Sequence, residues 1–513
     1  MDNYQKSRGA VRVQVPICDK QTVTELSSDF SLPDYQPQIK RLLRVCATVS
    51  PPDRYVGSGR AEFSGNVDYS ILYSGNDGAL YCATERADYQ WSVPVEMTAD
   101  IDLNEGFVCD VDVVPDIATG RVIAPRRLSV KCRLRSHVRL WGIRQIEESI
   151  SAPEQYGIER LCGHTKSARL FVGNGEPLQL GDEILLDATD ADLRVISAEG
   201  EVFVQDATAG SGVVNARGEV CLKLLCCRES APNTPVLQLR RIPFEQEIVT
   251  EGAEVNCDCC ADGVCSEIRV TVEEGRLLCE VSLRLRARAQ RNEEFSFTRD
   301  LYSTHAECES RSTTCTLPLA IKCINGNVSL NHTATLEEVG IRTGTNVLDL
   351  SLTPSVISLE YENGKYRLTG RCRAHVILAD EEDFYAQEFE IPFRYDTDGE
   401  DNPTLDYDAA VSTVSCRARV DGERIAIDAE LAVALAVRGE CRVEMLIEAQ
   451  FGDPIARTGA VCTICYPAKS DTLWSVAKRY HRAVNAIAES NALAGSPAAD
   501  SPDSLSGVKY LLV

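Results

Sequence analysis

Similar stretches of sequence recur three times along this chain, at a spacing of about 149 residues. An apolar-proline-apolar motif occurs with two equal steps of 149 residues, at Val93–Val95, Ile242–Phe244 and Ile391–Phe393. A long alternating stretch begins at Arg127, and comparable stretches begin at Arg276 and Arg424, with steps of 149 and 148 residues. A unit of this length is too long for one turn of a solenoid. The recurrence predicts three consecutive copies of a whole domain.

Within the copies, the pattern of apolar residues is that of β-strands. Residues 61–73 alternate between apolar and polar side chains, and residues 128–140 do so with one change of face near Ser136. A period of two is typical of half-buried strands. Turn-forming sequences at 75–78 and 362–364 favour hairpins. We therefore expect a mainly β protein with three tandem antiparallel β-sandwich-like domains.

The copies and the sequence after them define four predicted domains, at residues 1–150, 151–308, 309–455 and 461–513. The joints 154–162 and 300–308 resemble each other and contain no run of glycine and serine. Flexible linkers are rich in those two residues. The sequence therefore predicts semi-rigid, end-to-end packing of the three β domains.

The C-terminal stretch has helical patterns instead. Ser470 or Asp471 can cap a helix. Apolar residues then recur at helical spacing, at Leu473, Val476, Ala477 and Tyr480. A second short helix fits residues 483–490, with Asn491 at its C-cap position. Apolar runs on both sides of the two helices predict a flanking pair of strands.

This order and the sequence 470–480, Ser-Asp-Thr-Leu-Trp-Ser-Val-Ala-Lys-Arg-Tyr, resemble a LysM module. The resemblance implies a small β-α-α-β module that binds a partner and does not catalyse a reaction, so we expect no enzyme. It also implies a binding groove made by Asp471, Thr472, Leu473, Trp474, Ile487, Asn491 and Leu493. For Trp474, packing between the helices is the alternative to contact with a partner.

The first copy resembles a known domain as well. The segments 28–45 and 65–73 are similar to the start of a SPOCS domain, and the similarity fades in the later copies. Repeated SPOCS domains followed by one LysM module resemble the SipL-like family of clostridial spore coat morphogenetic proteins. The resemblance implies a spore coat assembly adaptor in the mother-cell cytoplasm, at the forespore surface. Its implied partner is the coat-basement morphogenetic ATPase, with self-association or other coat proteins as further partners.

A glycan-binding function is the alternative, because most LysM modules bind N-acetylglucosamine chains such as those of peptidoglycan. Two features of the sequence argue against it. Ser470 stands where such modules usually have glycine, and the loop 493–504 is extended in a way that would reshape the groove.

The composition limits the partners further. The net charge is −24, from 53 Lys and Arg and 77 Asp and Glu. An acidic surface repels phosphate backbones and anionic lipids, so we expect no nucleic-acid partner and no membrane insertion. The first residues lack the apolar core of a signal peptide, and no apolar stretch has the length of a membrane span. We expect a protein that stays in the cytosol.

The chain contains 22 cysteines, most densely at Cys257, Cys259, Cys260 and Cys265. Four thiolates can bind zinc, but this spacing matches no common zinc motif. In a reducing compartment, scattered cysteines behave as small buried apolar residues. We therefore expect free thiols here, no bound metal and no cofactor.

Two strands carry rows of arginine, which are unusual in so acidic a chain. One row is Arg133, Arg135 and Arg139, and the other is Arg284, Arg286 and Arg288. Cross-strand pairing with nearby carboxylates is one interpretation. A docking face for another acidic copy or a partner is the other.

Overall fold

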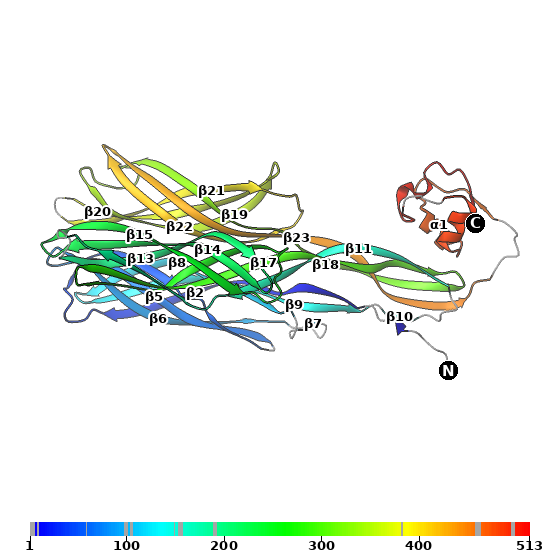
Figure 1. Cartoon of the computed structure of the whole chain (residues 1–513), viewed down its shortest axis with the longest axis horizontal. Coiled ribbons are helices and arrows are strands. Elements are labelled where there is room, and N and C mark those ends of the chain that lie inside the picture. Colours follow the sequence, from blue (N-terminus) through cyan, green and yellow to red (C-terminus); the bar gives the residue numbers. More distant parts are fainter. Residues whose placement is uncertain are drawn as a thin grey trace.

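The computed structural model describes residues 6–7, 10–57, 59–96, 101–102, 106–147, 149–151, 157–187, 192–380, 383–456, 463–493 and 498–513. The chain is mainly β, with 76% strand and 4% helix, and nearly all strand pairs are antiparallel. The predicted fold class is confirmed at this level. The strands form three successive blocks of two sheets each, and a small mixed module follows them (Figure 1).

The first block contains the strands predicted from the alternating sequences 61–73 and 128–140. One sheet has β2 (Ala10–Ser31), β7 (Ile101–Asp102), β8 (Val108–Ala124) and β9 (Arg127–Glu147). The other has β3 (Ile39–Val49), β4 (Asp53–Gly57), β5 (Arg60–Gly75) and β6 (Leu80–Pro94). Tyr69 and Ile71 of β5 pack against Leu128 and Val130 of β9, so the core lies between the two sheets.

The second block repeats this arrangement. One sheet has β11 (Ile158–Asn174), β12 (Leu178–Leu185), β16 (Asp258–Glu273) and β17 (Arg276–Ser303). The other has β13 (Leu193–Ala209), β14 (Val213–Arg228) and β15 (Ala231–Val249). Their apolar faces enclose one core, in which Val220 and Leu222 of β14 and Leu277 and Val281 of β17 are fully buried.

In the third block, one sheet is shared with short segments from the start of the chain. It has β18 (Ala306–Thr335), β22 (Leu405–Asp421) and β23 (Arg424–Pro454), with β1 (Lys6–Ser7) and β10 (Ser149–Ser151) at its edge. The other has β19 (Asn346–Glu362), β20 (Lys365–Ala379) and β21 (Phe384–Asp398). The predicted hairpin at 362–364 joins β19 to β20, where Asn363 and Gly364 have φ values of 53° and 79°. Two successive positive φ angles are what a tight hairpin turn requires.

The prediction of end-to-end packing is wrong, because the three blocks lie side by side. Leu72, Leu225 and Ile377, one from each block, belong to a single buried apolar cluster. Each of them interrupts the period-two alternation with a further apolar residue, as in Ile71-Leu72-Tyr73. A strand that is apolar on both faces is buried on both faces. This second apolar face brings the blocks together along their length.

Two charge networks also join the blocks. In the first, Arg44 contacts Glu199 and donates to Asp349 at 2.5 Å, and Lys223 lies 2.9 Å from Glu199 and 3.0 Å from Asp349. Burial alone would raise the pKa of Asp349, but the charges of Arg44 and Lys223 outweigh it and hold that pKa below its ordinary value. All three blocks therefore contribute charge to one buried network.

The second network contains part of the arginine row of β17, and this part both pairs across its own sheet and contacts another block. Arg286 and Arg288 pair across the sheet with Asp262, and they also contact Asp110 and Asp112 of the first block. Further members are Arg139, Asp408 and Arg438. In the other row, Arg133 pairs with Asp116 on the neighbouring strand, while Arg139 contacts Asp408 of the third block. The docking partner of these arginines is another copy within the same chain.

The long strands β11, β17, β18 and β23 extend beyond the body of the molecule and form an arm (Figure 1). Pairing continues to the tip of this arm, where Ile158 is opposite Ser303 and Ala306 is opposite Pro454. Leu301, Leu446 and Ala449 form a small buried cluster within it. The C-terminal module lies beside the tip of the arm.

Candidate functional site: the C-terminal module

The module consists of two short helices and a two-stranded sheet. Its elements are β24 (Ile464–Cys465), α1 (Leu473–Arg479), α2 (Val484–Ser490), the 3-10 helix η3 (Pro502–Leu505) and β25 (Leu511–Leu512). Cys465 is paired with Leu511 and Ile464 with Leu512. Within the predicted range 461–513, residues 461–462 and residues 494–497 of the extended loop lie outside the described part of the chain.

The cap of α1 is Thr472, and not Ser470 or Asp471 as the sequence suggested. The Ser475 amide donates to Oγ1 of Thr472 at 3.1 Å, and the Thr472 amide donates to Oγ of Ser475 at 2.9 Å. This reciprocal pair satisfies two backbone donors that a helix start leaves free. Asp471 instead accepts from Arg479 and from the Ala468 amide, and the bond from Arg479 lowers its pKa. Thr472 and Asp471 therefore fix the turn before the helix.

The second helix ends as predicted. Asn491 is the C-cap residue of α2. Its side-chain amide donates to the Leu512 carbonyl at 2.8 Å, and its carbonyl oxygen accepts from the Leu512 amide at 2.7 Å. These two bonds hold the end of α2 against β25.

The remaining predicted groove residues share one apolar cluster. Leu473, Trp474 and Ile487 are buried in it, and Leu493 packs against it. The structure thus brings these four side chains together. It also places a residue of the arm, Tyr302, in the same cluster.

Tyr302 covers Trp474. Their ring centroids are 5.0 Å apart with an edge-on angle of 67°, an arrangement favoured by the charge distribution of aromatic rings. Trp474 Nε1 donates to Asp300 at 2.9 Å, which satisfies the buried indole. Trp474 is only 6% exposed. Trp474 therefore packs both within the module, in the cluster that contains Ile487 of α2, and on the arm through Tyr302.

Polar contacts surround this aromatic pair. Lys478 donates to Asp300 at 2.6 Å, and the Tyr302 hydroxyl donates to the Arg482 carbonyl at 2.6 Å. Further contacts join His481 to the Ser303 carbonyl at 3.1 Å and Arg299 to Asp500 at 2.7 Å. In the sequence, residues 300–308 are recognisable only as a joint between copies. No period or motif indicated that they would hold the module.

The outer face of the two-stranded sheet is apolar and exposed. Tyr466 is 76% exposed, Tyr510 55%, Ile464 53% and Leu512 37%. Ile464 is paired with Leu512, so these two side chains lie on one side of the sheet, while Cys465 and Leu511 face the core. Tyr466 directly follows one strand and Tyr510 directly precedes the other. We call these four residues the sheet face. Contiguous exposed apolar residues of this kind mark contact surfaces.

The cysteine group that was considered for zinc is spread over several environments. Cys259 Sγ donates to the Ala207 carbonyl at 3.2 Å, and Cys323 Sγ lies 2.9 Å from Cys260 Sγ. Burial raises the pKa of Cys259 to about 12, which keeps it a thiol. Within the described ranges, the group with metal-binding spacing is Asp110, Asp112 and Asp408. Those carboxylates are already paired with arginines.

Among the described residues, the helices are too short or too polar to cross a membrane. Comparison with protein-family models, with curated proteins and with solved structures gave no match to this chain.

Proposed function

We propose that this protein is a non-enzymatic adaptor in spore coat assembly, in which the β body forms a rigid support and the C-terminal module binds a protein partner. The sheet face is the observation that carries this proposal. Two tyrosines and two aliphatic residues project together from the module, and aromatic residues are enriched at protein interfaces.

The position of Trp474 favours this face over the groove as the contact surface. Two of the predicted groove residues, Leu473 and Trp474, are buried, and Tyr302 of the arm lies in the same apolar cluster. A partner that contacted these two residues would have to displace the arm and remove the two donors of the module, Trp474 and Lys478, from Asp300. The sheet face needs no such rearrangement.

The arm supports the adaptor role in a second way. It holds the module at one end of an elongated molecule (Figure 1). Side-by-side packing of the three blocks and their shared charge networks make the body stiff. A stiff support with a binding module at its end suits a protein that positions other proteins. By resemblance, the partner of the module is the coat-basement morphogenetic ATPase at the forespore surface.

Copurification from sporulating cells tests the proposal. The full chain with an affinity tag should capture the ATPase, and a variant lacking residues 466–513 should not. Circular dichroism must show the β signal of the body in the deletion variant. If instead the full chain binds N-acetylglucosamine oligomers and captures no protein that depends on the module, the module is a glycan binder and the adaptor role is wrong.

A further inference from the structure

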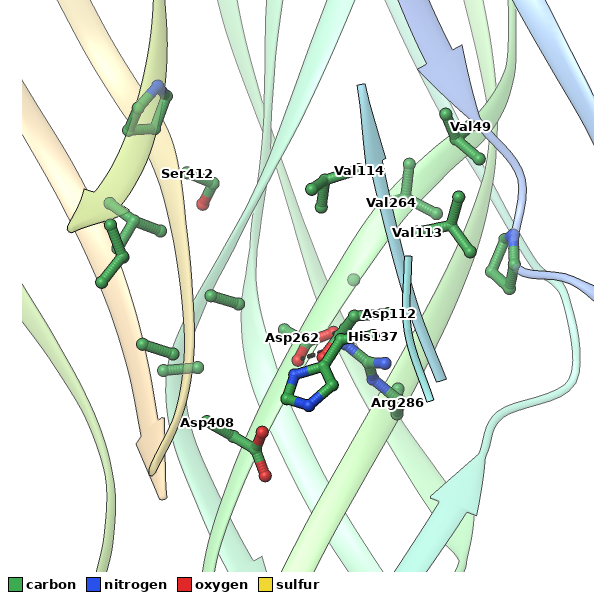
Figure 2. A pocket seen from close by; sticks show the side chains of 18 of the residues that line it. Val49, Asp112, Val113, Val114, His137, Asp262, Val264, Arg286, Asp408 and Ser412 are labelled. Atoms are coloured by element: carbon green, nitrogen blue, oxygen red, sulfur yellow. Dashed lines mark hydrogen bonds and ion pairs between the residues drawn. The ribbon is translucent and has the colours of Figure 1, made fainter. Parts of the chain in front are cut away.

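A cavity of about 1130 Å³ lies between the three blocks. Its lining includes Val113 and Arg135 of the first block, Glu201 and Arg284 of the second, and Arg373 and Ser412 of the third. Figure 2 shows Asp112, Asp262 and Arg286 close together, with Val113, Val114 and Val264 lining the cavity beside them. The volume is in the range of small-molecule sites.

The third block contributes small residues to the cavity at positions where the other two blocks have large basic ones. Arg284 and Arg286 lie on β17, and the repeat step of 148 residues places Ala432 and Ala434 of β23 at the corresponding positions. A step of 149 residues relates Arg284 and Arg286 to Arg135 and His137 of β9 in the first block. All six residues line the cavity. The two alanines fill less space than the basic side chains at the corresponding positions of the other two blocks.

Most charged side chains of the lining are paired with each other or with neighbouring residues. Arg286 pairs with three carboxylates, Arg371 with Glu390, and His137 with Asp19. Asp116, Asp406 and Asp408 have arginine partners as well. In this paired part of the lining the carboxylates outnumber the arginines, so it offers no unpaired cation to a ligand.

Four arginines of the lining have no carboxylate partner among the described residues, namely Arg54, Arg135, Arg284 and Arg373. Arg54 and Arg373 donate only to backbone carbonyls. The side chain of Arg284 is half-buried and makes no hydrogen bond within the described ranges, and its Nε is fully buried. A buried N–H donor that lacks an acceptor costs free energy.

On the acidic side, two lining residues lack a cationic partner in the described chain, Asp53 and Glu201. Glu201 is exposed to the cavity, but the surrounding protein displaces much of its water, and this desolvation together with the nearby charge of Glu199 raises its pKa to about 7. Its carboxyl is then partly protonated at neutral pH and can donate a hydrogen bond. Among the lining residues that have no ion-pair partner in the described chain, the four arginines therefore outnumber the two carboxylates.

We propose that this cavity binds a small polyanion with carboxylate or phosphate groups, and that Arg135 and Arg284 are its main contacts. Guanidinium groups bind both kinds of anion through paired, charge-assisted hydrogen bonds. The ligand would meet residues of all three blocks, so its binding would stabilise the assembled body. This site is independent of the C-terminal module and of the partner proposed for it.

Isothermal titration calorimetry with citrate and with pyrophosphate tests the site on the full chain at constant ionic strength. We expect saturable binding of at least one probe, and the preferred probe distinguishes carboxylate from phosphate ligands. Arg284→Gln and Arg135→Gln should each weaken binding by about tenfold or more. Arg217→Gln is the control, because Arg217 forms an exposed ion pair with Glu245 outside the cavity.

The melting temperature separates a ligand-binding role from a structural one. Arg284→Gln removes an unpaired charge, so the free protein should melt no lower than the wild type, while the stabilisation by the probe should be lost. Absence of saturable binding by both probes would overturn the proposal. Equal binding by wild type and the Arg284→Gln variant, with both folded, would do so too.

Discussion

Trp474 of the C-terminal module donates its indole N–H to Asp300 of the arm at 2.9 Å, so one side chain connects a binding module to the support that carries it. The same carboxylate accepts from Lys478 at 2.6 Å. Together with Tyr302, Asp300 determines where the module lies relative to the body.

Replacing Tyr302 should release the module from the arm. Tyr302→Ala removes the aromatic contact with Trp474 and the hydrogen bond to the Arg482 carbonyl, and large-to-small changes at such buried sites cost about 3–5 kcal/mol. We expect the tryptophan emission to shift to longer wavelength and proteolysis to cut between body and module. Tyr302→Phe keeps the ring and should lose only about 1 kcal/mol.

Removing Arg44 should destabilise the whole body. Arg44→Ala leaves Glu199 and Asp349 buried with Lys223 as their remaining cation, and breaking a buried pair in this way costs about 3–5 kcal/mol. Guanidinium unfolding measures the loss. As the control, Arg217→Ala breaks an exposed pair and should cost less than about 1 kcal/mol. Equal costs for the two variants would show that the network does not hold the blocks together.

Stability should fall at acidic pH. The folded-state pKa of Asp349 lies below its ordinary value of 3.8, because the charges of Arg44 and Lys223 outweigh the effect of burial. The stability that such a group contributes is complete above the unfolded-state pKa and is lost as pH falls towards the folded-state value. Melting temperatures should therefore drop steeply below about pH 4. Asp349→Asn should be less stable at neutral pH and show a weaker acid dependence.

Glu201 should have the opposite pH dependence. Its pKa is raised from 4.5 to about 7 in the folded protein, so between these values the folded state binds the proton and the unfolded state does not. Stability should therefore decrease as pH rises through this interval. Glu201→Gln removes the titrating group, and the variant should melt higher than the wild type at pH 8. A wild-type protein with the same pH profile as the variant would contradict the assigned environment.

A chelator should not change the melting temperature, because Cys257, Cys259, Cys260 and Cys265 are expected to be thiols and not zinc ligands. Burial raises the pKa of Cys259 to about 12, whereas zinc binds the thiolate. Elemental analysis of the purified protein is the second check. A stoichiometric metal would show that the cysteine assignment is wrong.

Local patterns in the sequence predicted the strands well but not how the blocks pack. The alternation at 61–73 and 128–140 corresponds to β5 and β9, and the two helices of the module lie where their spacing put them. Packing between the blocks depends on residues such as Leu72 and Ile377. Each adds an apolar residue on the second face of its strand, but a single such residue does not indicate which part of the chain covers it. The contact between Tyr302 and Trp474 joins residues far apart in sequence, and neither has a local pattern that predicts the other.

Affinity of the full chain for the coat-basement ATPase, measured by biolayer interferometry, tests the central claim most directly. The double variant Tyr466→Ala and Tyr510→Ala removes half of the sheet face, and loss of central interface aromatics typically costs about 2 kcal/mol or more, roughly thirtyfold in affinity. Tyr35→Ala is the control, since Tyr35 is 84% exposed but lies in the body. The account predicts that the double variant loses binding while its module stays folded and the control binds like the wild type. Unchanged binding by the folded double variant would contradict it.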